Sequence, residues 1–248
     1  MRRLAIYAIA DLHLPGGDVK PMDVFGEHWA NHFEKISADW RARVSENDLV
    51  LLPGDLSWAM QLADASEDLN RLGELPGRKV ILRGNHDYWW SGIRKVRDAL
   101  PGSMWAVQND CVVFDEAVIC GTRGWLLPAP SSTENDEKVY KRELLRLEMT
   151  LADARKRAEG RRVVCMLHYP PLLDLYRDTG FTELLERFGV RDVLYGHLHG
   201  AGIRTAFRGE HNGVRYHLVS CDSLGFKLYE LPEDDGVRPQ PPQEEPAI

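Results

Sequence analysis

Short apolar runs rich in valine, isoleucine and leucine alternate with longer amphipathic segments along most of this chain. This alternation is typical of a layered α/β domain, in which helices cover buried sheets. It predicts strands near residues 4–10, 48–52, 79–83, 104–107, 111–114, 117–120, 162–167, 192–195, 203–208, 213–220 and 226–231. Apolar residues at steps of three and four predict helices at 27–44, 58–72 and 134–158.

The predicted helices lie before residue 200, and only strands are predicted after it. The helix at 134–158 has the clearest boundaries, because Thr133 and Asp136 form a capping-box start and Gly160 follows its basic end. We therefore expect one domain over residues 1–231 that finishes with antiparallel strands. From residue 232 the chain becomes acidic and rich in proline, which predicts a disordered tail over 232–248.

Composition argues against several classes of protein. With 31 Lys and Arg against 38 Asp and Glu, the formal charge of −7 disfavours a general nucleic-acid binder with a basic surface. The apolar run at 4–10 is far shorter than a membrane-spanning helix, so we expect no membrane segment. The four cysteines have no close partner in sequence, which predicts reduced, buried thiols in a cytoplasmic protein.

Polar clusters follow immediately after five of the predicted strands, where α/β folds carry their active-site loops. Five of the nine histidines stand in these clusters. An Asp-x-His triplet arises about once by chance in a chain of this composition, whereas Gly-Asn-His-Asp arises roughly twice in a thousand such chains. The clusters are Asp11-Leu12-His13, Gly54-Asp55, Gly84-Asn85-His86-Asp87, Leu167-His168-Tyr169 and Gly196-His197-Leu198-His199.

The residue types in these clusters are typical of a metal centre. Asp, Asn and His without Cys suit manganese, iron, cobalt or zinc ions. Seven residues can hold two four-coordinate ions if one carboxylate bridges them, and Asp55 is our candidate for the bridge. Two divalent ions against the carboxylates of Asp11 and Asp55 leave a net positive site, even with a bridging hydroxide, which attracts an anion. Two such ions can hold a phosphoryl group during in-line displacement, so the clusters predict phosphoester hydrolysis.

In this order, the five clusters resemble those of the calcineurin-like metallophosphoesterase superfamily, over nearly all of residues 4–231. The resemblance implies a four-layer α-β-β-α sandwich of two mixed sheets flanked by helices, with the active site at the C-terminal edge of the sheets. It implies two divalent metal ions, for which we favour manganese, with iron, zinc or cobalt as alternatives. One ion would be held by Asp11, His13, Asp55 and His199, and the other by Asp55, Asn85, His168 and His197.

The same resemblance implies the catalytic residues. His86 matches the family's proton donor to the leaving oxygen, and Asp87 would orient and charge its imidazole. The expected reaction is attack by a metal-bridged hydroxide on a small soluble phosphomonoester or phosphodiester. Two alternatives remain open: a nuclease or phosphodiesterase acting on nucleic acid, which the net charge disfavours, and a metal-binding scaffold that docks a partner.

Two departures narrow the choice within the superfamily. Trp58 and Ala59 stand where protein Ser/Thr phosphatases have a further Asp and a phosphate-binding Arg, which argues against a protein phosphatase. His86 stands where the bacterial UDP-diacylglucosamine pyrophosphatases usually have Arg, which argues against a role in lipid A synthesis. Residues 54–60, 84–90 and 122–125 resemble a bacterial branch of predicted phosphohydrolases, for which no substrate follows from the resemblance.

Other residues near the clusters have two interpretations each. Arg123 could clamp a phosphate or form a surface salt bridge, and Tyr169 begins a proline-stiffened loop, 169–179, that could line the substrate pocket. An aromatic group close to the motifs could stack on a nucleobase, but core packing is the favoured interpretation. This group comprises Trp58, Tyr88, Trp89, Trp90 and Trp125.

Overall fold

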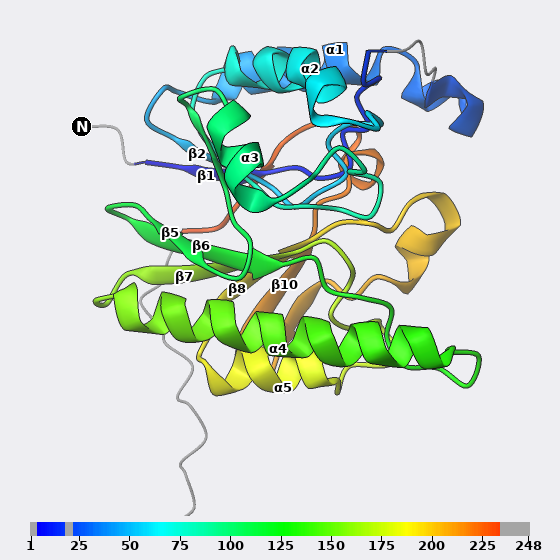
Figure 1. Ribbon diagram of the computed structural model, residues 1–248, viewed down its shortest axis with the longest axis vertical. Helices are drawn as coiled ribbons and strands as arrows, with labels where there is room; N and C mark the ends of the chain where they lie inside the picture. Colours follow the sequence, from blue (N-terminus) through cyan, green and yellow to red (C-terminus); the bar gives the residue numbers. More distant parts are fainter. Residues whose placement is uncertain (1–3, 18–21, 234–248) are drawn as a thin grey trace, which may run out of the picture.

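Two β-sheets pack face to face, and helices cover the outer face of each sheet (Figure 1). The computed structural model describes residues 4–17 and 22–233. The architecture is the four-layer α-β-β-α sandwich of two mixed sheets that the family resemblance implies.

The first sheet has five strands in the order β11-β1-β2-β3-β4. Strands β1 to β4 run parallel, and β11 pairs antiparallel with β1 at the edge. The strands are β1 (Ile6–Ala8), β2 (Leu49–Leu52), β3 (Arg78–Ile81), β4 (Met104–Ala106) and β11 (Tyr229–Glu230).

The second sheet has six strands in the order β5-β6-β7-β8-β10-β9. Its four central strands are parallel, and β5 and β9 close the two edges as antiparallel strands. The strands are β5 (Cys111–Val113), β6 (Ala117–Thr122), β7 (Arg162–Leu167), β8 (Asp192–Tyr195), β9 (Gly209–His211) and β10 (Val214–Leu218).

Helices α1, α2 and α3 lie on the first sheet, and α4 and α5 lie on the second (Figure 1). Because successive side chains of a strand point to opposite faces, β2 contributes to two apolar layers. Leu49 and Leu51 pack between the sheets, while Val50 and Leu52 pack under the helices. The helices are α1 (His32–Arg43), α2 (Leu62–Gly73), α3 (Ile93–Ala99), α4 (Glu134–Arg157) and α5 (Gly180–Arg187), with short 3₁₀ turns η1 (Met22–Phe25), η2 (Glu27–Trp29), η3 (Gly200–Thr205) and η4 (Asp222–Leu224).

Helix α4 confirms the predicted capping box, because Thr133 and Asp136 each accept the other's backbone N–H. Three other boundaries were wrong. The predicted helix at 27–44 is interrupted by Asn31, whose φ of 53° is left-handed, and the helix predicted at 58–72 begins only at Leu62. The first half of the strand predicted at 203–208 belongs to the turn η3, and its apolar residues Ala206 and Phe207 are buried, with only an isolated bridge from Ala206 to Leu173.

The chain's last strands mix both directions, since β10 runs parallel to β8 while β9 and β11 are antiparallel to their neighbours. The four cysteines are free and buried, as expected. No helix within residues 4–17 and 22–233 is long and apolar enough to cross a membrane. The predicted tail from residue 232 lies almost wholly outside the described residues, so its disorder and the domain boundary stay predictions.

Candidate metal centre

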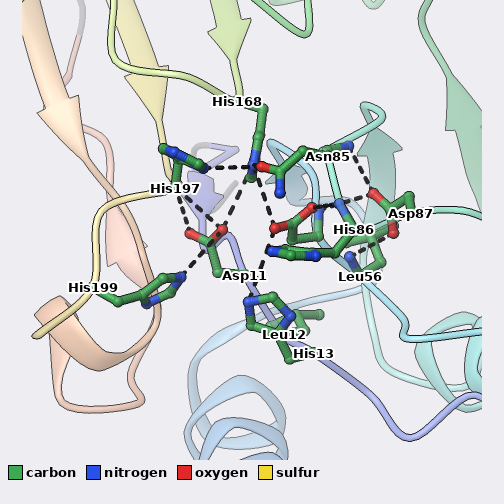
Figure 2. Close-up of polar contacts among 12 residues, drawn as sticks. Asp11, Leu12, His13, Leu56, Asn85, His86, Asp87, His168, His197 and His199 are labelled. Carbon is green, nitrogen blue, oxygen red and sulfur yellow. Dashed lines mark hydrogen bonds and ion pairs between the residues drawn. The ribbon is translucent and has the colours of Figure 1, made fainter. Parts of the chain in front are cut away.

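The polar clusters lie in loops that leave the carboxyl ends of strands in both sheets (Figure 2). Because parallel strands end at a common edge, loops far apart in sequence converge there. The expected ligands are placed as follows: Asp11 and His13 after β1, Asp55 after β2, Asn85 after β3, His168 after β7, and His197 and His199 after β8.

Asn85, His168 and His197 turn their ligand atoms toward one another (Figure 2). Oδ1 of Asn85 accepts hydrogen bonds from Nε2 of His168 at 2.7 Å and from Nδ1 of His197 at 2.9 Å. Oδ2 of Asp55 lies 3.4 Å from Nε2 of His168. These four residues are one of the two expected ligand sets, and the structure brings them together.

The ligand atoms of the second expected set lie farther apart than those of the first. Nε2 of His199 lies 3.6 Å from Oδ1 of Asp11, and Nε2 of His13 lies 4.0 Å from Oδ2 of Asp55. Asp11, His13 and His199 offer ligand atoms within 4.8 Å of one another, and so do Asp11, Asp55 and His168. The two groups overlap, so all seven expected ligands form one continuous cluster.

Both carboxylates lie between the two ligand sets. Asp55 uses Oδ1 to accept the backbone N–H of His86 at 2.8 Å, and its Oδ2 faces His13 and His168. Oδ1 of Asp11 lies 3.6 Å from His199 and 3.8 Å from His168, one residue of each set. The sequence pointed to Asp55 alone as a bridge, and the geometry adds Asp11 as a second candidate.

The backbone around the cluster is locally strained. Left-handed φ angles are uncommon for residues other than glycine and concentrate at functional sites. Glycines allow the loops to approach closely: a Cβ at Gly84 would lie 2.0 Å from Oδ1 of Asp55, and a Cβ at Gly196 would lie 2.5 Å from Oδ2 of Asp11. Four expected ligands adopt left-handed φ, namely Asp11 at 62°, His13 at 46°, Asp55 at 53° and His197 at 71°.

Two further groups fix the orientation of ligand imidazoles. Nδ1 of His168 donates to the carbonyl oxygen of Pro53 at 3.0 Å, and Nδ1 of His199 donates to Oδ1 of Asp222 at 2.9 Å. Such partners set the tautomer and leave the other ring nitrogen available for a metal. Asp222 was missed in the sequence, although it follows the β10 strand as the other clusters follow theirs.

The carboxylates hold protons on two of the imidazoles. Burial alone would lower the pKa of His199, but its contacts with Asp11 and Asp222 raise that pKa to about 10. Burial likewise opposes the charge on His168, but Asp55 and Asp11 raise its pKa to about 9. Both shifts have the same cause, the buried carboxylates of Asp11 and Asp55, which favour a positively charged partner.

The remaining two imidazoles stay neutral. Burial lowers the pKa of His13 to about 4, and burial together with the charge on His168 lowers the pKa of His197 to about 4. Neutral imidazole is the form that binds a metal ion.

Some buried ring nitrogens of the centre have no hydrogen-bond partner among the described residues. They include Nδ1 of His13 and Nε2 of His199. Leaving a buried polar atom unpaired is costly, whereas a divalent ion among these side chains would give such atoms a partner. The oxygen and imidazole donors, the buried negative charge and the unpaired nitrogens all fit a divalent metal ion.

A sequence profile of the calcineurin-like phosphoesterase family matches residues 4–201, a stretch that contains all seven residues of the cluster. The chain belongs to this family. As a calcineurin-like phosphoesterase it is a phosphoric ester hydrolase, and the candidate metal-binding residues lie together at its sheet edge. Among curated proteins, the search finds no match.

Solved structures share the fold at low sequence identity. Phosphopantetheinyl hydrolase from Mycobacterium tuberculosis is 16% identical, with a TM-score of 0.57 over 95% of this chain and 98% of that one. A protein of unknown function from Aquifex aeolicus is 13% identical, with a TM-score of 0.49 over 92% of this chain and 96% of that one. The first likeness supports the calcineurin-like fold and, at this identity, says nothing about substrate.

The catalytic pair expected in this phosphoesterase is only partly assembled. His86 lies beside the metal cluster, with its ring centroid 5.7 Å from that of His13. The expectation that Asp87 orients the His86 imidazole stays a prediction: here the Asp87 carboxylate points into the loops, and Nδ1 of His86 has no partner among the described residues. Asp87 instead accepts N–H groups from Asp55, Leu56, Ser57, Gly84 and the Trp89 indole.

The two expected substrate contacts lie beside the centre. Tyr169 is buried, with its ring centroid 4.1 Å from that of His197, so its ring packs against this proposed metal ligand. The Arg123 guanidinium lies over the Trp125 ring, 4.6 Å from its centroid, and forms no ion pair with the described residues. It lines a polar cavity of about 260 Å³ together with Arg83 and Arg142.

The core interpretation of the aromatic group holds for some of its members. Trp89 and Trp90 are buried in the apolar layer under the first sheet's helices. Trp58 instead reaches the cluster of proposed metal ligands, where its ring stacks on His13 at a centroid distance of 4.7 Å. Tyr88 is exposed.

Proposed function

We propose that this phosphoesterase carries two divalent metal ions and hydrolyses a small soluble phosphomonoester or phosphodiester. The observation that supports it is the convergence of Asp, Asn and His donors from five separate loops on one sheet edge. Manganese is the favoured ion, with iron, zinc or cobalt as alternatives. In this proposal Asp11, His13, Asp55 and His199 hold one ion, and Asp55, Asn85, His168 and His197 hold the other.

Ions bound there would supply Lewis-acid stabilisation of phosphoryl oxygens and lower the pKa of water to near neutrality. The protein's own residues supply position and protons. His86 is the proposed proton donor to the leaving oxygen. Its backbone is fixed by the N–H donated to Asp55, and its ring packs 4.5 Å from the Trp58 ring.

Asp87 is proposed to hold the two ligand loops in register. Its one carboxylate accepts N–H groups from Gly84 on one loop and from Asp55 and Leu56 on the other. Arg123 remains the proposed contact for a negatively charged part of the substrate outside the ligand cluster, because its guanidinium is free of ion pairs with described residues and lines a cavity with three other arginines.

Chelation tests the proposal. Exhaustive removal of metal is expected to abolish hydrolysis of a chromogenic phosphoester, and added manganese is expected to restore it. Full activity after verified metal removal would refute the dependence on metal. A screen of phosphomonoesters, cyclic nucleotides and dinucleotides with manganese-loaded protein would then define the substrate class.

Two outcomes of the same screen would favour the alternatives. Degradation of single-stranded DNA would favour a nuclease despite the net charge of −7. A metal-filled protein inert toward every ester would favour a scaffold. The free, buried cysteines support a cytoplasmic location.

A further inference from the structure

An apolar hollow of about 340 Å³ opens directly beside the metal cluster. His13 and His199, two proposed metal ligands, and His86, the proposed proton donor, form one of its walls. The other lining residues are Met22, Phe25, His28, Trp29, Trp58, Gly200 and Asp222.

The walls of this hollow are flat aromatic rings. Trp58 stacks on His13 with 21° between the ring planes, and the Trp29 ring lies 5.8 Å from that of His199. Phe25 stands on the turn η1 with 62% of its surface exposed, so its ring borders the hollow without serving the core. Rings arranged in this way favour an aromatic occupant over a flexible aliphatic one.

Charge also limits what the hollow can hold. Among the described residues no lysine or arginine lines it, and its one carboxylate there, Asp222, already accepts hydrogen bonds from His199 and Gly200. An anionic group would find its partners in the separate arginine-lined cavity that contains Arg83 and Arg123. The described lining therefore favours an uncharged occupant.

We propose that the hollow beside Trp58 and Phe25 binds an uncharged aromatic leaving group of the phosphoester. This inference rests on the proposed function, because His86 must deliver its proton to the oxygen that carries this group. The same hollow explains Trp58 itself: a tryptophan at the position of the protein phosphatases' second Asp provides a wall in place of a carboxylate.

The test compares naphthyl phosphate with phenyl phosphate, whose leaving groups have similar acidity but different apolar area. Manganese-loaded protein is expected to prefer naphthyl phosphate by about tenfold in kcat/KM. Phe25→Ala is expected to reduce this preference about fivefold. Val24→Ala is the matched control, because Val24 is 72% exposed on the same turn and does not line the hollow; its preference should equal that of the wild type.

Binding to metal-free protein provides a readout that does not depend on turnover. Naphthol should quench tryptophan fluorescence saturably, because Trp29 and Trp58 line the hollow, and Phe25→Ala should weaken this binding while Val24→Ala does not. Saturable naphthol binding without hydrolysis of any ester would support the hollow as a site for an aromatic group and would refute the proposed function. Equal kcat/KM for both esters, together with no saturable naphthol binding, would overturn the inference and leave the phosphoesterase activity standing.

Discussion

Replacing Asp222 with asparagine tests whether this residue tunes one of the two proposed ions. Its carboxylate accepts hydrogen bonds from Nδ1 of His199 at 2.9 Å, from the backbone of Gly200 at 3.1 Å and from the backbone of Ser223 at 3.0 Å. Asparagine has nearly the same shape but keeps only one acceptor oxygen and no charge. If that oxygen stays on His199, the amide group faces the Gly200 N–H and one hydrogen bond is lost.

The geometry sets the expected size of the effect. Loss of a partner behind a ligand histidine typically weakens metal binding 10- to 100-fold. Asp222→Asn keeps the hydrogen bond to His199 and removes the charge behind it, so we expect the lower end, about tenfold or roughly 1.4 kcal/mol. Only one of the four ligands of that ion is affected. The ion proposed for Asn85, His168 and His197 should bind as in the wild type.

The assay is a calorimetric manganese titration of metal-free protein, which resolves two binding events if their affinities differ. The control is Asp178→Asn, because Asp178 also accepts a histidine N–H, from His211 at 3.1 Å, but is 86% exposed and pairs with a histidine outside the proposed ligand set. Wild-type affinity at both sites in Asp222→Asn would refute the role of Asp222. Equal weakening in the Asp178→Asn control would show that the assay reports general stability instead.

Three further substitutions make separate predictions. Asp55→Asn should weaken both ions together, and two full metal equivalents by elemental analysis would contradict a bridge. His86→Ala should slow esters with poor leaving groups at least about tenfold more than esters with good ones, because only poor leaving groups need a proton; equal losses in kcat would remove His86 from this role. Asp192→Asn should destabilise the fold by about 3 kcal/mol in urea unfolding at pH 7, since it leaves buried arginine charge unpaired. Burial raises the pKa of Asp192, but hydrogen bonds and charge from His217, Arg215 and Arg162 lower it from 3.8 to about 2. This shift contributes roughly 2 kcal/mol to the free energy of unfolding above pH 4, and the contribution is lost as the pH falls toward 2. The pH profile of the Asp192→Asn variant should lack this loss of stability.

The positions of the ligand loops could be predicted because they depend on local sequence. A buried strand is visible as a short apolar run, and the residue that follows it must lie at the sheet edge. Asp11, Asp55, Asn85, His168 and His197 each obey this rule, so the order of strands and polar clusters was sufficient to place them.

Contacts between loops could not be predicted in the same way. Asp222 reaches His199 because β10 pairs in parallel with β8, a register that no local pattern reveals. The partners of Asp87 were missed for a similar reason, since its carboxylate accepts hydrogen bonds from backbone N–H groups of a loop 30 residues away along the chain. The apolar residues Ala206 and Phe207 predicted a strand, although burial in the core outside a strand produces the same composition.

Hydrogen bonds between the ligand loops offset the strained backbone at the two carboxylates. Left-handed φ angles at Asp11 and Asp55 are unfavourable for isolated residues, so each must be offset by contacts that exist only in the folded protein. Asp11 accepts the backbone N–H of His197, and Asp55 accepts that of His86, so each carboxylate ties its own loop to a loop from another strand. Because each of these hydrogen bonds joins two ligand loops, together they help to hold the two carboxylates in position.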